Sequence, residues 1–353
     1  MPALNRPRIL ALAVTGSAMF LLSTRPALAD GSHDQAPPPP PKTDTSGNAD
    51  GSGTISASAG VVYDRTHNGQ GPQTGAVAPQ GNWSPPPCWY APKYTPAQLK
   101  AYLEPIWEAE STGYEWDAKQ RNHYEKGDGK GSDYKDFNKA KTGKGYWWDS
   151  YVDDSRIGEP GALSCDKPIF WVDKGDPPPT DIPQAITPEI LSQLAYAEIR
   201  VPDTKVTLAP SGATKVNLPT WAWLDKTDFK PVSVTASVPV LNIQATTTAT
   251  PVSMKIEPGT SDAELYPASG ECAINPDGSI GTPYVKGDAD KTPPCGLTYL
   301  RASGNNGPYK LKATITWNIS WTGTGQANPK TLPSGTFGTT QDVTVEEIQA
   351  INR

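Results

Sequence analysis

The chain has 353 residues and is acidic, with 31 basic and 37 acidic residues, a formal charge of −6 and four cysteines. Nucleic acids and anionic lipids attract basic surfaces, so this balance argues against both as partners. Residues of the hydrophobic class make up 36% of the chain, enough for a folded core, and 38 prolines with 32 glycines indicate long connecting segments.

Residues 1–29 are predicted to be a secretory signal peptide. Arg6 and Arg8 form a basic start, Ile9–Leu22 is apolar, and Ala27–Ala29 provides small residues for cleavage. Removing this segment, which holds three arginines and no acid, takes the net charge from −6 to −9. No later segment is long and apolar enough to span a bilayer. We therefore expect a protein that is secreted or held at the cell envelope, with no membrane span after signal removal.

Residues 30–85 are predicted to be a flexible segment rich in proline and glycine. The run "APPPPPK" and the polar tract after it cannot bury apolar surface. Within the segment, "GTISASAGVVYD" alternates apolar and small polar residues, which predicts one strand at 54–63. We expect this short strand either to pair with a sheet edge or to stay loose.

Residues 86–181 are dense in tryptophan and are predicted to form a small module of helix and irregular structure. Thr95, Pro96 and Gln98 make a capping box with proline at the first helical position, which predicts a helix near 96–110. Pro105 is expected to kink or break that helix. The triple proline of "DKGDPPP" marks the end of the module.

Residues 182–203 are predicted to contain a connecting helix that begins at Thr187 and Pro188. In residues 204–353 the apolar residues recur with a period of two, and no helical pattern interrupts them. This repetition predicts a mainly β fold with an antiparallel β-sandwich at the C-terminus. The expected strands lie at 204–210, 215–225, 230–238, 241–249, 252–259, 309–323 and 340–351.

The four cysteines are expected to form disulfides, as in other exported proteins. They allow three pairings, of which we favour Cys88–Cys165 with Cys272–Cys295 because each pair then lies within one compositional region. No two cysteines have the CxxC spacing, which argues against redox and zinc chemistry.

Several separated blocks resemble a family of secreted actinobacterial proteins of unknown function. These blocks are "NWSPPPCWYAPKYTP", "TGKGYWWDS", "KVNLPTWAWLD" and the run that begins "CGLTYLRAS". From about Val232 the chain also resembles PKD-type immunoglobulin-like domains, with Thr298-Tyr299 and Gly307–Tyr309 in place and "KIEPGT" where such domains have a "GDG" turn. The resemblance implies an extracellular location and an immunoglobulin/PKD-like β-sandwich, and almost nothing about chemistry.

Motifs for cofactors and nucleophilic catalysis are absent from the sequence. No GxGxxG occurs, and "KAKTGKG" departs from a P-loop at Asn138 and Gly145. There is no GxSxG motif, and His123 is the single histidine outside linker-like sequence. Asp288 with Asp290 lacks the spacing of a calcium loop. We therefore predict no catalytic residue, no cofactor and no metal site.

Aromatic and acidic side chains are the remaining candidates for a site. Tyr146, Trp148 and Trp171 could stack on the rings of a glycan. Adjacent tryptophans of an extended segment point to opposite faces, so at most half of this cluster could face a ligand. We therefore favour these rings as the hydrophobic core of the module. Acids that could serve a hydrolase are Glu104, Glu108, Asp149, Asp153 and Asp154.

These observations favour a secreted, non-enzymatic protein that mediates interaction or assembly at the cell envelope or outside the cell. Its partner would be an unknown protein or an envelope glycan. One alternative is a glycan-binding module that uses exposed aromatic side chains. Another is a secreted hydrolase that uses paired carboxylates.

Overall fold

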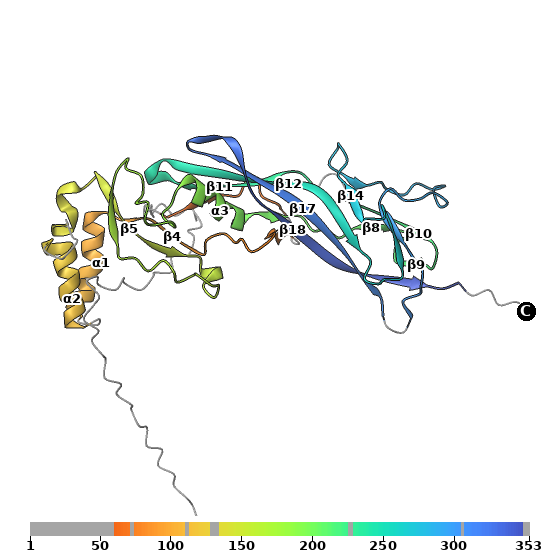
Figure 1. The fold of residues 1–353 in the computed structure, drawn as a ribbon, viewed down its shortest axis with the longest axis horizontal. Helices are drawn as coiled ribbons and strands as arrows, with labels where there is room; N and C mark the ends of the chain where they lie inside the picture. Colours follow the sequence, from red (N-terminus) through yellow and green to blue (C-terminus); the bar gives the residue numbers. More distant parts are fainter. Residues whose placement is uncertain are drawn as a thin grey trace, which may run out of the picture. The chain divides into compact units, whose positions relative to one another are not determined.

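The computed structural model describes residues 60–70, 74–109, 113–127, 134–224, 229–304 and 307–348, all of which belong to one compact unit. The fold is mainly β and contains several antiparallel sheets (Figure 1), as predicted. The predicted signal peptide lies outside the described residues, as do residues 54–59 of the first predicted strand. No helix in the described part is long and apolar enough to cross a membrane.

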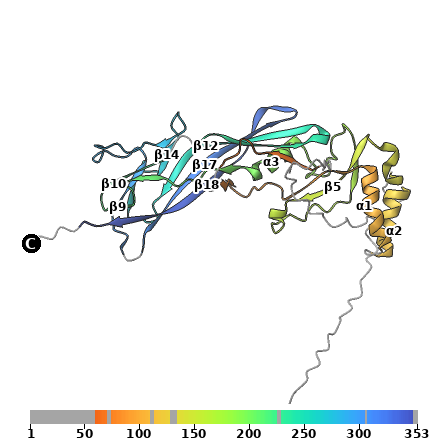
Figure 2. The same ribbon diagram turned by 180° about the vertical axis from the view of Figure 1, so that it is seen from behind.

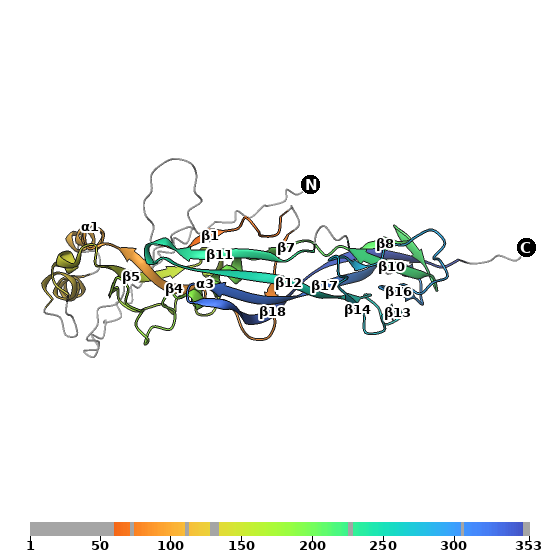
Figure 3. The same ribbon diagram turned by 90° about the horizontal axis from the view of Figure 1, so that it is seen from above.

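The largest sheet is built on three long antiparallel strands, β12 (Ile243–Glu257), β17 (Tyr309–Gly323) and β18 (Gln326–Glu346), which lie side by side (Figure 3). In β17 every second residue from Leu311 to Trp321 is buried, because alternate side chains of a strand point to opposite faces. The sheet is completed by β1 (Val62–Asp64), β3 (Ala78–Pro79), β9 (Ala213–Lys215), β11 (Val232–Val238) and β14 (Glu271–Ala273).

Two elements cover the buried face of this sheet at different places along its long strands (Figure 2). The helix α3 (Pro188–Glu198) packs against β11, β12 and β17, so the predicted connecting helix is part of the core. A second antiparallel sheet contributes its buried side chains to the same core. Its strands are β8 (Thr207–Ala209), β10 (Pro219–Leu224), β13 (Ala263–Tyr266), β15 (Ile280–Gly281) and β16 (Gly296–Tyr299).

Both favoured disulfides are confirmed. Cys272 in β14 is bonded to Cys295, which directly precedes β16, so this bond joins the two large sheets. Cys88 begins β4 (Cys88–Tyr94) and is bonded to Cys165 in the loop after β5 (Gly145–Val152).

A third antiparallel sheet, of β4, β5 and β6 (Phe170–Asp173), has both faces buried. Trp148 on one face belongs to the core that lies between the large sheet, α3 and the second sheet, called here the large core. Trp147 on the other face packs with Leu99 and Leu103 of α1 (Pro96–Glu108) in a separate cluster, called here the second core. The helix predicted for this module is present, but the prediction that the rest is irregular is wrong, because these three strands form a sheet. Because both faces of β5 are covered, its sequence has no polar alternation that would mark it as a strand.

The two predicted helices are confirmed at their starts. In α1 (Pro96–Glu108), Thr95 Oγ1 accepts the Gln98 N–H and Gln98 Oε1 accepts the Thr95 N–H. Thr187 Oγ1 likewise accepts the Ile190 N–H at the start of α3. The helix α1 continues past Pro105, so this proline does not break it. Pro105 is exposed, as is Ala101, whose carbonyl loses its helical partner, so water can hydrogen-bond that carbonyl.

Shorter elements complete the described structure. The aromatic region, residues 88–173, contains α2 (Tyr114–Arg121) and the π-helical turn Asn122–Lys126 beside α1 (Figure 1). The remaining short elements are the 3₁₀ turns Asp136–Lys141, Asp154–Arg156 and Pro239–Leu241 and the paired strands β2 (Gly75–Ala76) and β7 (Arg200–Val201).

Two long strands of the large sheet differ from prediction, and one short strand takes the first of the two outcomes expected for it. The strands expected at 241–249 and 252–259 form one strand, β12, with a bulge at Val252. The strand β18 begins at Gln326, well before the predicted start at 340, because its pairing with β17 overrides a first half rich in threonine, glycine and proline. The short strand β1 pairs with β11, so this part of the chain does join a sheet edge.

Candidate ligand-binding site

The three aromatic residues predicted to bind a glycan do not form one surface. Tyr146 and Trp148 point to one face of β5 and contact the large core, where Trp148 is 1% exposed. Trp171 lies opposite Trp147 on the neighbouring strand and packs against the second core. The structure therefore does not bring the three rings together in one platform, because the two-residue period of β5 and the cover on both faces separate them.

Trp171 nevertheless lies in the wall of a pocket. The pocket has a volume of about 330 Å³, close to the lower end of the range for small-molecule sites. Trp171 is half-buried, and polar side chains with both signs of charge share the wall with it. The pocket is lined by Tyr134, Asn138, Lys141, Trp171, Val172, Asp173, Asp176, Pro177 and Pro179.

Asp173 connects the polar groups of this pocket. Its Oδ1 accepts the indole N–H of Trp171 at 2.7 Å, and its Oδ2 accepts the Lys141 ammonium at 3.2 Å. The hydrogen bond from Trp171, followed by that from Lys141, lowers the pKa of Asp173 below its usual value. The Asp173 carboxylate therefore stays ionised and holds the indole ring in one orientation.

The second core supports the pocket from beneath. The ring of Trp147 meets those of Tyr134 and Trp171 edge-to-face, with centroids 4.6 and 5.5 Å apart. The Tyr134 hydroxyl also accepts the backbone N–H of Trp171 at 3.2 Å. Trp147 is thus a core residue, as expected, and its role is to fix the two aromatic walls.

Strained backbone forms another side of the pocket. Asp136, Phe137 and Asn138 adopt left-handed conformations, with φ of 45°, 54° and 56°. Such runs of non-glycine residues are costly and concentrate at functional sites. The conformation is held by Phe137, which is buried against Trp107 and whose carbonyl accepts the Trp147 indole N–H at 2.9 Å. It places Asn138 in the pocket wall.

A larger open groove of about 820 Å³ lies between β8 and β18. Its lining consists of aliphatic, hydroxyl, amide and charged side chains from residues such as Lys205, Thr207 and Gln341. No aromatic side chain is among them, so the groove has no ring on which a sugar could stack. The pocket at Trp171 is therefore the better candidate for a ligand site.

Among the acids proposed for a hydrolase, Asp149 is the most unusual. Its side chain is 6% exposed and lies 3.4 Å from the Lys93 ammonium, which is 5% exposed. Burial raises the pKa of Asp149, although Lys93 opposes this shift. The Lys93–Asp149 pair does not line the pocket at Trp171.

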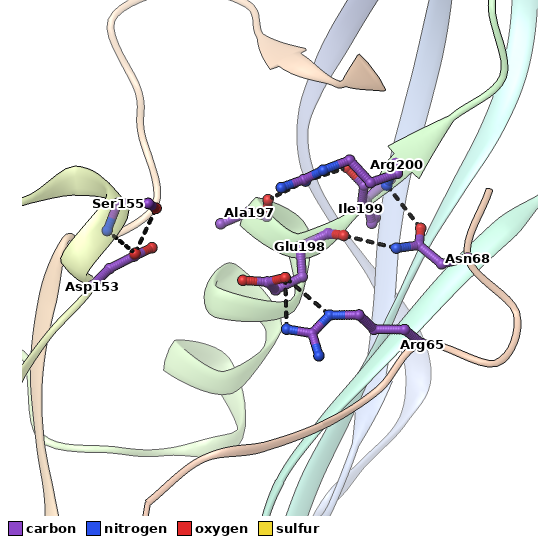
Figure 4. Close-up of polar contacts among 8 residues, drawn as sticks. All are labelled: Arg65, Asn68, Asp153, Ser155, Ala197, Glu198, Ile199 and Arg200. Carbon is purple, nitrogen blue, oxygen red and sulfur yellow. Dashed lines mark hydrogen bonds and ion pairs between the residues drawn. The ribbon is translucent and has the colours of Figure 1, made fainter. Parts of the chain in front are cut away.

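Two of the other predicted acids, Glu104 and Asp153, have local structural roles. Glu104 forms a helical ion pair with Lys100, and Asp153 accepts the N–H and hydroxyl of Ser155 (Figure 4). The pocket itself holds Asp173 and Asp176, but a glycosidase also needs an acid with a raised pKa. The pKa of Asp173 moves the opposite way. The described residues contain no group of three that could hold a metal ion.

A separate polar cluster fastens the first described strand to the end of α3 (Figure 4). Arg65 donates two hydrogen bonds to Glu198 Oε2 at 3.0 and 2.8 Å. Asn68 donates to the Glu198 carbonyl and accepts from the Arg200 N–H, each at 2.8 Å. Sequence reasoning missed these contacts because Arg65 and Glu198 are far apart in the chain and lie in unremarkable polar sequence.

Pocket residues other than Trp171 were likewise missed. Tyr134, Asn138 and Lys141 lie in a segment whose charge and glycine content resemble a solvated loop. Their association with β6 is a tertiary feature that no local pattern encodes.

No known protein family, curated protein or solved structure matches this chain.

Proposed function

We propose that this protein is an extracellular, non-enzymatic binding protein whose pocket at Trp171 accepts one sugar residue of a cell-envelope glycan. The single observation that carries the proposal is the pocket itself. A half-buried indole held by Asp173 offers an apolar surface, and Asn138 and Lys141 lie beside it. Sugar rings have apolar C–H faces and a rim of hydroxyls, which match an aromatic wall next to hydrogen-bonding groups.

Rigidity supports the same proposal. The indole of Trp171 is oriented by Asp173 and braced by Trp147, so little conformational entropy remains to be lost on binding. A pocket of about 330 Å³ suits a single ring better than a long chain. The rest of the glycan would extend into solvent.

Location and fold class belong to the proposal as well. Residues 1–29 have the pattern of a signal peptide, and two disulfides suit an oxidising compartment. Two antiparallel sheets that share a core and are joined by Cys272–Cys295 support an immunoglobulin/PKD-like sandwich. N-terminal sequencing of the protein from culture medium should begin at Asp30; retention in the cytoplasm with residue 1 intact would exclude secretion.

The binding function is tested by calorimetric titration of the protein with soluble fragments of cell-envelope polysaccharides. We expect saturable binding that Trp171→Ala weakens by about tenfold or more, equivalent to about 1.4 kcal/mol. Tyr114→Ala is the matched control, because Tyr114 is an aromatic residue that is 82% exposed and does not line the pocket. Equal affinities for the wild type and a folded Trp171→Ala variant, or no binding across the panel, would exclude the proposal.

A further inference from the structure

The ion pair Lys93–Asp149 is buried, an environment that is unfavourable for charged side chains. Both side chains are almost completely buried, at 5% and 6% exposure, and the Lys93 nitrogen lies 4.5 Å from the centre of the Tyr151 ring. Burial penalises two separate charges, and their mutual attraction offsets that penalty only in part. An amine and a carboxyl group that are held in contact away from water are the two groups that can condense to an amide.

Backbone geometry brings the two groups together. The pairing of β4 with β5 is irregular at Lys93, since Pro92 lies opposite Trp148 and Tyr94 lies opposite Trp147. A bulge of this kind re-aims one side chain of the strand. Here the Lys93 nitrogen lies 3.4 Å from Asp149 Oδ2 and donates to the Ser150 carbonyl at 2.9 Å. Both groups are therefore held in place.

The two oxygens of Asp149 are in different surroundings. Oδ1 accepts the backbone N–H of Ser150 at 2.7 Å, whereas Oδ2 is the oxygen next to the Lys93 nitrogen. A backbone N–H on Oδ1 stabilises negative charge that develops there when a nucleophile attacks the carboxyl carbon. Oδ2 is then in position to take protons from the amine and to leave.

We propose that Lys93 and Asp149 condense into an amide bond that joins β4 to β5 covalently. The Lys93 ammonium passes one proton to Oδ2, and the resulting amine attacks Asp149 Cγ. A second proton moves from the nitrogen to Oδ2, the Cγ–Oδ2 bond breaks, and one water molecule leaves. One C–N bond forms and one C–O bond breaks, so no oxidant, reductant or co-reactant is needed. Holding the two groups together supplies the advantage that an intramolecular reaction has over one in solution.

The amide would cross-link β4, the strand that the Cys88–Cys165 disulfide also cross-links. Cys88 and Lys93 are at opposite ends of β4, and the strand pairs with β5 between them. The disulfide would thus hold one end of β4 to the loop after β5, and the amide would hold the other end of β4 to β5 itself. For a protein outside the cell, an amide has the further property that reducing agents do not break it.

Peptide mapping of the full-length wild-type protein tests the bond directly. After the disulfides are reduced and alkylated, trypsin should release residues 66–93, 94–100 and 145–156 as separate peptides if Lys93 is unmodified. We expect instead one joined peptide in which residues 66–100, uncut at Lys93, are linked to residues 145–156, with a mass one water molecule below that of peptide 66–100 plus peptide 145–156. Fragmentation should place the link at Lys93 and Asp149. Complete release of the separate peptides would overturn the proposal.

Lys93→Arg is the matched control. Arginine keeps the positive charge and the trypsin site, but its guanidinium is not a nucleophile, so the joined peptide should disappear. Asp149→Ala should abolish it as well. If either variant fails to fold, the wild-type map still decides the question by itself. A joined peptide that persists in Lys93→Arg would place the link at other residues and would also overturn the proposal.

Discussion

The two parts of this protein bury their strands in different ways. In the long-strand region, residues 232–346, β17 buries one face and exposes lysine, threonine and asparagine on the other. In the aromatic region, residues 88–173, β5 is covered on both faces, by the large core and by the second core. The unusual groups are all found in the doubly covered sheet or beside it: the Lys93–Asp149 pair, the pocket at Trp171 and the strained turn at Phe137.

This difference in burial shows where a β-rich protein can keep polar side chains in an unusual environment. A sheet with one exposed face lets its charged side chains reach water, where ion pairs contribute little. A charged side chain in a sheet covered on both faces is removed from water. It therefore needs a buried partner of opposite charge to offset the loss of hydration. The long-strand region therefore acts as scaffold, and the aromatic region carries the candidate site.

The largest expected effect concerns the two disulfides. In the Lys93→Arg background, replacing Cys88 and Cys165 by serine should cost about 4.5 kcal/mol, against about 3.4 kcal/mol for Cys272 and Cys295. The reason is the length of chain that each bond closes, with sequence separations of 77 and 23. Urea denaturation of the two double-serine proteins measures the difference, and a larger loss for the Cys272–Cys295 pair would contradict it.

The same experiment in the wild-type background sharpens the contrast. An amide between Lys93 and Asp149 would shorten the loop that Cys88–Cys165 closes to about the length of the other loop. The two disulfide losses should then become nearly equal.

A middle-sized effect separates the two cores. Trp147→Phe removes the indole N–H that Phe137 O accepts at 2.9 Å and leaves a buried carbonyl without that donor, at a cost of about 1–3 kcal/mol. Trp317→Phe is the matched change in the long-strand region. Trp317 is also fully buried, but its indole nitrogen has no hydrogen-bond partner in the described structure. Chemical denaturation should show the greater loss for Trp147→Phe, and equal losses would show that the hydrogen bond is unimportant.

The smallest expected effect is a pH dependence confined to the aromatic region. Burial lowers the pKa of His123 below its usual value of 6.5. The unfolded chain therefore binds this proton more readily than the folded protein. The contribution to stability is present above pH 6.5 and is lost as the pH falls from there through the lowered folded value.

Denaturation midpoints at about pH 7.5 and about pH 5.5 measure this contribution. His123→Gln should reduce the loss of stability on acidification. His67→Gln, which changes an exposed histidine, should leave that loss as it is in the wild type. If the two variants respond identically to pH, the dependence does not come from His123.

Several features could be predicted because their signals are local. Thr95 with Gln98, and Thr187 with Pro188, mark helix starts through contacts within one turn. The strand β17 repeats its apolar residues every two positions because one face meets water and the other does not. Composition favoured the observed disulfide pairs among three possible pairings, since each pair joins cysteines of one region.

Other features could not be predicted because distant residues decide them. The run Gly145–Val152 lacks polar alternation, so its pattern fits a buried strand no better than an apolar cluster. The length of β18 depends on pairing with β17 and not on the propensity of its own residues.

The sequence by itself determined the β-rich class, the starts of the two long helices and the opposite directions of Trp147 and Trp148, since each rests on periodicity or capping. Composition favoured one of the three possible disulfide pairings. The tertiary structure decided which of those rings is near a pocket, and it brought Lys93 next to Asp149. A bulge in β4, a left-handed turn at Asp136–Asn138 and a second core under β5 were all needed. The physical reason is that a site is formed by side chains from several segments of the chain, while a sequence pattern reflects only the local environment of a single segment.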